Sequence, residues 1–252
     1  MIKLFDILTE GVYDPGIFKA VFTAGGPGSG KSYTASTLFG MPEKMPYVTA
    51  QGLNGGNSDS TFEAYLDKAK MDKNLEKLSK RDYKLAQGMR EKAKRVTIAR
   101  MNSFINSKLG LLIDGTGKNY GKIAKMKKRL ESEGYDCFMV FVNTDLEVAL
   151  ERNRKRDRVV PEHIVKSAWK EVNNNLGKFQ GLFGASNMLV IDNSTYKEFA
   201  PRVKKAAASF TRKPIQNHLA KKWIKQELQF RNLYKKFPAG SPNNKGGKRK
   251  WV

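Results

Sequence analysis

The sequence predicts an α/β fold in which a five-stranded parallel sheet is covered by helices on both faces. Short apolar runs alternate with segments of helical periodicity along the first 196 of the 252 residues. Such alternation implies right-handed crossovers, which make the strands parallel and place helices on both sides of the sheet. Beyond residue 196 the composition changes to a basic helical segment. We therefore predict a domain over residues 1–196 and an extension over residues 197–252.

Five apolar runs predict the strands of this sheet. Uninterrupted apolar runs are typical of parallel strands that are buried on both faces. The second run is short, because the segment 45–59 begins with apolar residues and continues as a loop rich in Gly and Asn. The predicted strands lie at residues 18–24, at the start of 45–59, and at 109–115, 137–143 and 187–193.

Apolar residues at helical spacing predict the helices between these strands. The lysine-rich segment 61–108 is predicted to be a helical excursion, which could be a substrate clamp or a scaffold. Asp145 is well placed to cap the helix that follows the fourth strand. The apolar stripe over residues 165–179 is predicted to be core. The other predicted helices lie at 1–10, 31–40, 118–134, 145–156 and 218–237.

The segment between the first strand and the first following helix matches the phosphate-binding pattern G-x-x-x-x-G-K-[ST]. In such a P-loop, backbone N–H groups close around phosphates, the lysine contacts the β- and γ-phosphates, and the hydroxyl binds Mg²⁺. The sequence therefore predicts a P-loop NTPase fold with ATP and Mg²⁺ as cofactors. The candidate nucleotide-binding residues of this loop are Gly25, Gly26, Gly28, Ser29, Gly30, Lys31, Ser32 and Tyr33.

Asp114 ends the third predicted strand, at the sheet edge where ligands of such folds bind. We expect it to hold the metal together with Ser32. ATPase motors usually carry a second acid at the next position to activate water, whereas this chain has Gly115. The missing acid favours transfer of the phosphate to a substrate hydroxyl over hydrolysis, and therefore a kinase.

Asp59 follows the second strand and is a candidate base for the acceptor hydroxyl. An equally good interpretation is a helix N-cap, a position that Asp favours. Thr116, in the loop after the third strand, is a candidate substrate-binding residue.

Four arginines lie within one short segment: Arg152, Arg154, Arg156 and Arg158. On a helix, Arg152 and Arg156 would share one face, and the other two would share the opposite face. One pair could then close on phosphates, because planar guanidinium groups reach several phosphoryl oxygens. The alternative is a solvated charge run. Arg152 and Arg154 are candidates for binding the nucleotide, and Arg158 is a candidate for binding the substrate.

The formal net charge is +23 and is concentrated near the end of the chain. Residues 201–252 carry a net charge of +14, against +9 for the first 200 residues. Such a segment favours polyanions, with nucleic acid first and anionic membranes second, although a solubilising tail is the alternative. From about residue 238 the tail is too poor in apolar residues to fold alone. The oligomeric state is not evident from the sequence.

The single cysteine, Cys137, lies in an apolar strand, so a buried thiol is expected rather than a reactive one. The apolar runs are all shorter than the roughly 18 residues of a membrane span. We therefore expect a cytoplasmic protein that has no membrane partner.

The segments GGPGSGKS, NSD, LLIDGTG and RNRKRDRVVP, in this order, resemble the kinase domain of phage-type polynucleotide 5′-kinases and, more loosely, the zeta-toxin kinases. The resemblance covers residues 18–193. It implies that Asp59 is the general base on the acceptor hydroxyl and that Arg156 stabilises the transferring phosphate. It also implies that Lys31, Ser32 and Asp114 hold the nucleotide and its metal.

The chain departs from polynucleotide kinases at two positions. Phe62 stands where they carry an arginine that holds a phosphate of the nucleic acid, and Leu112 stands where a phosphatase would need an acid. We expect an ATP-dependent kinase that acts on the 5′-hydroxyl of a nucleic acid and has no phosphatase activity. The alternatives are a zeta-toxin-like kinase of a nucleotide sugar or another small hydroxyl compound, and a nucleic-acid-binding protein that uses the nucleotide as a switch.

Overall fold

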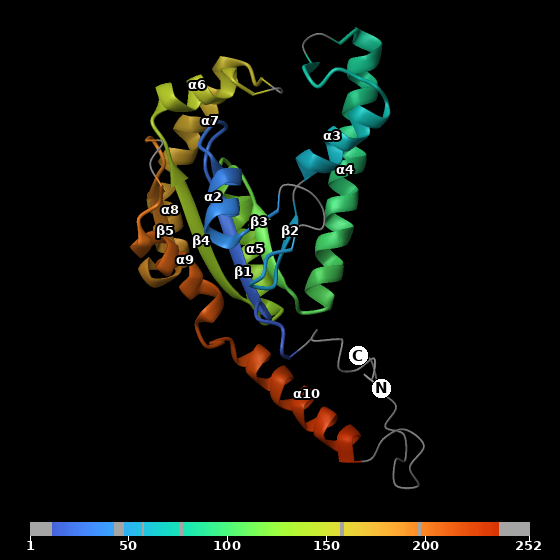
Figure 1. The fold of residues 1–252 in the computed structure, drawn as a ribbon, viewed down its shortest axis with the longest axis vertical. Coiled ribbons are helices and arrows are strands. Elements are labelled where there is room, and N and C mark those ends of the chain that lie inside the picture. Colours follow the sequence, from blue (N-terminus) through green and yellow to red (C-terminus); the bar gives the residue numbers. More distant parts are fainter. Residues whose placement is uncertain are drawn as a thin grey trace.

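A computed structural model describes residues 12–42, 48–56, 58–75, 78–156, 159–195 and 198–236. The predicted helix at 1–10 and the predicted disordered tail from about residue 238 lie outside these residues. In the described part of the chain, helices cover both faces of a central sheet (Figure 1). This arrangement confirms the predicted three-layer α/β fold.

The described residues form one sheet of five strands in the order β2-β3-β1-β4-β5, and all neighbouring strands are parallel. β1 is central and completely buried. The glycine-rich segment that follows it therefore opens at the middle of the carboxyl edge, where ligands of such sheets bind. The strands are β1 Lys19–Ala24, β2 Leu53–Gly56, β3 Gly110–Asp114, β4 Asp136–Asn143 and β5 Met188–Asp192.

The second strand does not lie where the sequence predicted it. β2 occupies Leu53–Gly56, inside the stretch rich in Gly and Asn, whereas Val48 makes only an isolated antiparallel bridge. Close backbone packing explains the glycines: a Cβ at Gly110 would lie 2.5 Å from the carbonyl oxygen of Gly52. Asn54 Nδ2 donates to the carbonyls of Gly52 (3.3 Å) and Gly110 (3.1 Å). Polar contacts thus replace the apolar packing that a sequence pattern detects.

The two faces of the sheet bury separate apolar clusters, because successive strand residues point to opposite sides. On β1, Val21 packs in one cluster with α2 and α9, whereas Phe22 packs in the other with α5, α7 and α8. Cys137 is buried in the second cluster, and burial raises the pKa of its thiol, as expected for an unreactive cysteine. These helices are α2 Lys31–Phe39, α5 Tyr120–Ser132, α7 Glu162–Asn174, α8 Leu176–Phe183 and α9 Pro201–Arg212.

The helix predicted over 165–179 is broken at Asn175 into α7 and α8. The side chain of Asn175 is buried, and its Nδ2 donates to the carbonyls of Gly117 (3.1 Å) and Lys118 (2.9 Å). These bonds tie the break to the loop after β3. The predicted core role of the stripe is confirmed, because Val172 and Phe179, on either side of the break, are buried in the same cluster. α8 is followed by a 3₁₀ turn at Ala185–Asn187.

The predicted helical excursion is a hairpin of α3, Ser58–Lys68, and α4, Lys80–Asn106. It has a cluster of its own, in which Phe62 of α3 packs with Ala86 and Ala93 of α4. Phe62 is 1% exposed. The residue that replaces the expected arginine is therefore a core residue of the hairpin. In Figure 1 the hairpin rises beside the carboxyl edge of the sheet, opposite α6 (Leu146–Arg154) and α7.

The basic extension begins as two helices with different surroundings. Ala207 and Phe210 of α9 are buried in the cluster that also holds Val21, so α9 packs on the sheet. α10, His218–Lys236, extends away from the sheet at the end opposite to α6 and α7 (Figure 1). The predicted domain boundary near residue 196 stays a prediction, and the packing of α9 favours placing it after that helix. None of the described helices is long and apolar enough to cross a membrane.

α10 starts at the amino edge of the sheet, where Asp136 begins β4. Asp136 accepts hydrogen bonds from Lys19 Nζ (2.9 Å) and from the backbone N–H groups of Gln216 (2.9 Å) and Asn217 (3.0 Å). The ring of Trp223 packs edge-on against Phe18, which precedes β1. Because the phosphate-binding loop follows the other end of β1, α10 begins at the edge of the sheet farthest from this loop.

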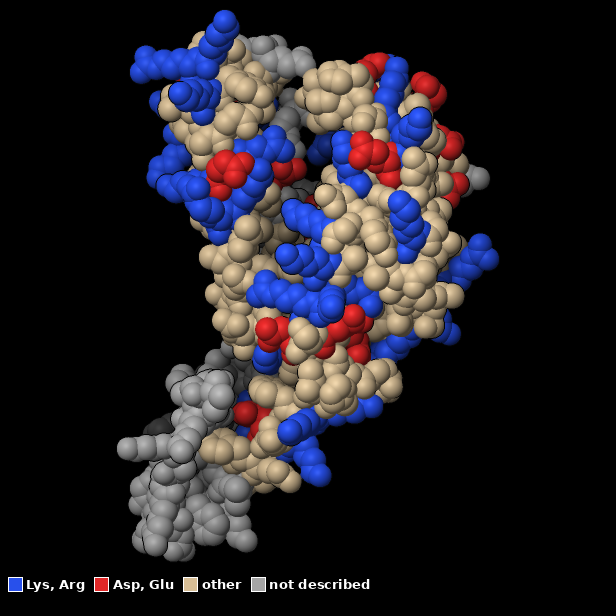
Figure 2. All heavy atoms as spheres, turned by 180° about the vertical axis from the view of Figure 1, so that it is seen from behind, with Lys and Arg blue, Asp and Glu red and all other residues tan. Residues whose placement is uncertain are grey.

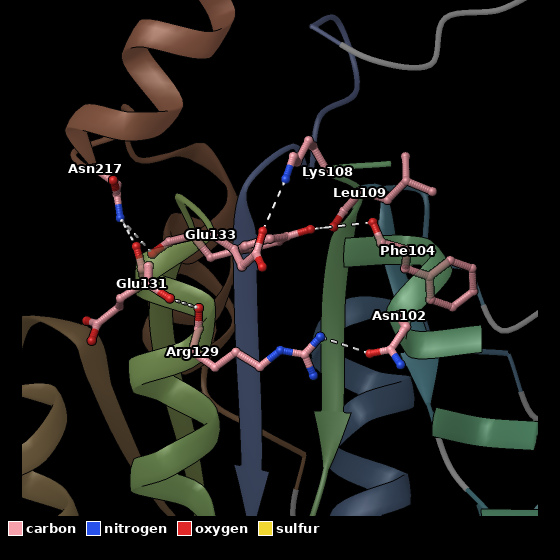
Figure 3. A network of polar contacts seen from close by, with 10 residues as sticks. Asn102, Phe104, Lys108, Leu109, Arg129, Glu131, Glu133 and Asn217 are labelled. Carbon is pink, nitrogen blue, oxygen red and sulfur yellow. Dashed lines mark hydrogen bonds and ion pairs between the residues drawn. The ribbon is translucent and has the colours of Figure 1, made fainter. Parts of the chain in front are cut away.

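α5 lies on the face of the molecule seen in Figure 2, where Lys and Arg side chains gather over the middle. Polar contacts hold its last turns in place (Figure 3). Arg129 Nη2 donates to Asn102 Oδ1 of α4 (3.0 Å), and Lys108 pairs with Glu133 (3.4 Å). Asn217 Nδ2 donates to the carbonyl of Glu131 (2.8 Å). The carboxyl end of α5 is thereby joined to both α4 and the start of α10.

Candidate functional site

The glycine-rich loop between β1 and α2 has a backbone that side chains would obstruct. Gly28 and Gly30 have φ angles of 77° and 86°, in the left-handed region. A Cβ at Gly28 would lie 2.1 Å from the carbonyl oxygen of Ala149, and one at Gly30 would lie 2.2 Å from Asn193 Nδ2. The two glycines are therefore required by their neighbours as well as by the turn.

Buried polar side chains hold this loop from the neighbouring strand ends. The carbonyl of Ser29 accepts hydrogen bonds from Asn193 Nδ2 (2.8 Å) and Thr144 Oγ1 (3.0 Å). The N–H of Gly25 donates to the carbonyl of Thr116 (3.0 Å), and Trp169 Nε1 donates to the carbonyl of Thr144 (2.7 Å). The loop is thus fixed by the segments that follow β3, β4 and β5. A preformed loop is what tight phosphate binding requires.

Lys31 begins α2, and its ammonium turns back onto the loop. Its Nζ donates to the carbonyls of Gly25 (2.8 Å) and Gly26 (3.1 Å). Burial lowers the pKa of Lys31, since it disfavours the charged form. The Asp114 carboxylate opposes this shift, the positive charge of Arg156 adds to it, and the Asp59 carboxylate again opposes it. A lysine with these neighbours is poised to receive additional negative charge.

The same electrostatic interactions indicate that four predicted site residues lie near one another. Asp59 lies in the first turn of α3, Asp114 at the end of β3, and Arg156 just beyond α6, yet each acts on Lys31. Asp114 Oδ1 also accepts a hydrogen bond from Thr23 Oγ1 of β1 (3.0 Å). The carboxyl edge of the sheet therefore combines two carboxylates with two cations.

The residues at this edge fit a magnesium–nucleotide complex. Ser32 is exposed in the first turn of α2, and the Asp114 carboxylate is exposed as well, so hard oxygen donors are available. Among the described residues, no group of three or more His, Cys, Asp or Glu side chains could hold a metal on its own. Mg²⁺ commonly takes only one or two protein ligands and completes its shell with phosphates and water. The Ser29 hydroxyl is buried and has no hydrogen-bond partner among the described residues.

The arginine-rich segment is not one continuous helix. We predicted that Arg152 and Arg156 share one face of a helix. α6 ends at Arg154, so Arg156 lies beyond the helix and the two arginines share no helical face. The helix ends because Asn153, which is fully buried, bonds with both its Nδ2 and its Oδ1 to the backbone of Val160. These bonds hold Asn153 and Val160 together, and the exposed Arg156 lies between them in the chain.

The other three arginines have different surroundings. Arg152 lies beside the phosphate-binding loop, and its Nη1 donates to the carbonyl of Asn193 (2.8 Å). Arg154 donates through Nε to Glu162 (3.0 Å) and is exposed, so this pair is a weak surface interaction. The predicted nucleotide role of Arg154 would require this pair to open. Arg158 lies outside the described residues.

A polar pocket of about 600 Å³ opens beside the loop after β3. Thr116 contributes to it, together with the first turn of α5 and with α7. Lys118 of the pocket pairs with Glu171 across it (3.0 Å). The pocket is lined by Thr116, Lys118, Asn119, Tyr120, Lys122, Glu171 and Asn175.

The family model of the zeta toxins matches residues 72–202, slightly more than half of the chain. The chain belongs to the zeta toxin family. No curated protein matches it. The matched region contains Asp114 and the arginine-rich segment. The P-loop precedes this region and extends the same site in space.

Solved structures resemble this zeta toxin family member in fold at low sequence identity. A kinase-like protein from Chloroflexus aurantiacus is 13% identical with a TM-score of 0.50, over 79% of this chain and 98% of that one. The PezAT toxin–antitoxin system of Streptococcus pneumoniae gives 12% identity and a TM-score of 0.46, with 84% and 86% covered. The Pnkp1/Rnl/Hen1 RNA repair complex gives 16% identity and a TM-score of 0.46, with 65% and 46% covered. The chain thus spans less than half of that last relative.

Family and fold together make this zeta toxin family member a P-loop phosphotransferase. The sequence did not reveal the buried polar residues that hold its loops. Asn153, Asn175 and Asn193 each bond to the backbone of a neighbouring segment at the carboxyl edge. The position of Asn193 directly after β5 was the available signal, since residues that follow parallel strands gather at one edge.

Proposed function

We propose that this protein transfers the γ-phosphate of ATP to a substrate hydroxyl, with Asp59 as the base. The observation that supports it is the convergence of Asp59, Asp114 and Arg156 on Lys31 at the carboxyl edge of the sheet. P-loop kinases position the phosphates and stabilise charge at such an edge, and little covalent chemistry is left to the protein. The chain supplies the corresponding groups from α2, α3, the end of β3 and the segment just beyond α6.

Each residue has a distinct task in this reaction. Lys31 and the loop N–H groups hold the β- and γ-phosphates, while Ser32 and Asp114 would hold Mg²⁺. When bound, Mg²⁺ neutralises charge on the phosphates. Asp59 accepts the proton of the acceptor hydroxyl while the oxygen of that hydroxyl forms a bond to the γ-phosphorus of ATP. The bond between the γ-phosphorus and the β–γ bridging oxygen breaks at the same time, and ADP is released. Arg156 stabilises the charge that spreads over the phosphoryl oxygens.

The acceptor that we propose is the 5′-hydroxyl of a nucleic acid strand. The strong positive charge of the chain supports a polyanionic substrate. The position of α10 limits the role of this helix in substrate binding, because it starts at the amino edge of the sheet. Basic side chains nearer to the site must therefore make the first contacts with such a strand.

A second candidate acceptor is a small hydroxyl compound such as a nucleotide sugar. The pocket beside Thr116 favours it, because about 600 Å³ is within the usual range for small ligands. Its lining of hydroxyl, amide, lysine and carboxylate groups suits a polar molecule with several hydroxyls. For this substrate the extension would have no role in catalysis.

The test is transfer of labelled γ-phosphate from ATP to a 5′-hydroxyl oligonucleotide and to a UDP-N-acetylhexosamine. Asp59→Ala should lower transfer by about 10²- to 10⁴-fold, the usual contribution of a general base. Its ATP affinity should stay near that of the wild type. Asp67→Ala is the matched control, since Asp67 is an exposed carboxylate two turns later on the same helix.

The outcomes separate the candidates. Label on the oligonucleotide that depends on Asp59 supports the 5′-kinase, and label only on the sugar supports the second candidate. If neither acceptor is labelled although ATP binds, the nucleotide acts as a switch and the proposed transfer is wrong. Equal activity of Asp59→Ala and Asp67→Ala would remove Asp59 from the mechanism.

A further inference from the structure

A row of lysines on the outer face of α5 has no role in the reaction described above. Lys122, Lys125 and Lys128 recur at three-residue spacing and are all exposed. Residues at this spacing lie on one side of a helix. We call these three residues the α5 stripe. The opposite side of the helix is fixed, since Leu130 is fully buried and Met126 packs against the same cluster.

The α5 stripe is not neutralised by the protein. Within the described residues, no carboxylate lies within ion-pairing distance of its three ammonium groups, whereas the adjacent Lys127 pairs with Glu131 (2.5 Å). The first turn of α5 also contains no acid. Lys122 therefore adds its charge to the positive end of the helix dipole, an arrangement that costs stability unless an anion is bound.

The α5 stripe begins at the pocket and leads away from it. Lys122 lines the pocket together with Thr116 and Tyr120. Since α5 starts at the carboxyl edge of the sheet and ends beside Asn217, the row runs along the face of the molecule toward α10. Figure 2 shows Lys and Arg side chains gathered along the middle of this face. From Lys122 to Lys128 the row spans about 9 Å, at the helical rise of about 1.5 Å per residue.

We infer that the α5 stripe binds the phosphates of a single-stranded nucleic acid whose 5′ end lies in the pocket. The inference rests on the proposed function for the reaction at that end, and on charge and geometry for the binding. Regularly spaced cations along a rigid helix match a backbone of regularly spaced phosphates. The ring of Tyr120 at the head of the row is partly buried and packs against Phe179, and its remaining exposed surface can contact a terminal base.

The same geometry argues against an anionic membrane as the partner. A helix that lies on a membrane inserts an apolar face between the headgroups. The apolar side of α5 is packed against the sheet, and its exposed side carries the α5 stripe. A linear row of charges that ends in a pocket also fits a nucleic acid strand better than it fits the flat surface of a membrane.

The experiment measures equilibrium binding of a fluorescent 5′-hydroxyl oligonucleotide to the full chain without ATP. The α5 variant combines Lys122→Gln, Lys125→Gln and Lys128→Gln, and the α10 control combines Lys221→Gln, Lys222→Gln and Lys225→Gln. At about 0.1 M salt the α5 variant should bind on the order of 100-fold more weakly. The slope of the logarithm of its binding constant against the logarithm of salt concentration should be shallower by about 2, because each of the three lost phosphate contacts contributes about 0.7. The α10 control should change by less than about 5-fold.

Other outcomes would overturn the inference. Unchanged binding by the α5 variant, or an equal loss in the α10 control, would place the strand elsewhere. If the α5 variant lost binding to phosphatidylserine vesicles but kept its binding to the oligonucleotide, the α5 stripe would be a membrane-binding surface. ATP affinity verifies that the variant is folded. Weakened binding together with no label transfer by the wild type would refute the proposed reaction and leave the α5 stripe a nucleic-acid surface.

Discussion

The phosphate-binding loop and the α3–α4 hairpin lie near each other at the carboxyl edge but are held together by different forces. Hydrogen bonds from Asn193, Thr144 and Gly25 fix the loop. An apolar cluster around Phe62 holds the hairpin and is separate from the two clusters of the sheet. Nucleotide binding and placement of Asp59 therefore depend on different parts of the structure, and mutations should separate them.

Phe62→Ala should give the largest effect. Removing a fully buried phenylalanine typically costs about 3–5 kcal/mol, and the small cluster has few other residues to compensate. We expect faster amide hydrogen exchange in α3 and in the first half of α4, and loss of phosphate transfer because Asp59 lies one turn earlier. ATP affinity should stay within about 2-fold.

The control for this variant is Ile98→Ala, because Ile98 lies on α4 and is 59% exposed. Exchange should be unaffected by it. If Phe62→Ala weakened ATP binding as strongly as transfer, the two regions would not be separable.

Gly28→Ala should produce the opposite pattern. Its Cβ would lie 2.1 Å from the backbone of Ala149 at a φ of 77°, so the loop must move. Strain of about 3 kcal/mol corresponds to roughly 100-fold weaker ATP binding, measured by titration, while hydrogen exchange in the hairpin should not change. Gly181→Ala is the matched control, since a Cβ there meets nothing within 4 Å. Equal ATP affinity in both variants would contradict a preformed loop.

The pH dependence of stability should give the smallest effect. Burial lowers the pKa of Lys31 in the folded state below its ordinary value of 10.5. Between the lowered pKa and 10.5 the unfolded chain holds more protons, so folding stability rises with pH in that window. The free energy of unfolding of the wild type, minus that of Lys31→Met, should therefore increase as pH rises. Urea unfolding of both proteins over this pH range measures it. A difference that falls with pH would contradict the assigned burial.

The parts of this structure that the sequence predicted are those with local signals. The P-loop, Asp114 and four of the five strands follow from short motifs and apolar runs. β2 was misplaced because Asn54 and its glycines pair through hydrogen bonds and close backbone contact. The ends of α6 and α7 were missed because Asn153 and Asn175 bond to residues brought near by the fold, which no periodicity reveals. The roles of Asp59, Arg156 and the metal ligands stay predictions.

The attachment of α10 has a consequence for the order in which the chain folds during synthesis. The sheet is complete once β5 has left the ribosome, whereas Asp136 receives its backbone partners from residues 216 and 217. Domains generally form from the amino end as synthesis proceeds. The nascent core can therefore assemble with the Lys19–Asp136 pair at its open edge, and residues 216 and 217 cover this pair only after they have been synthesised.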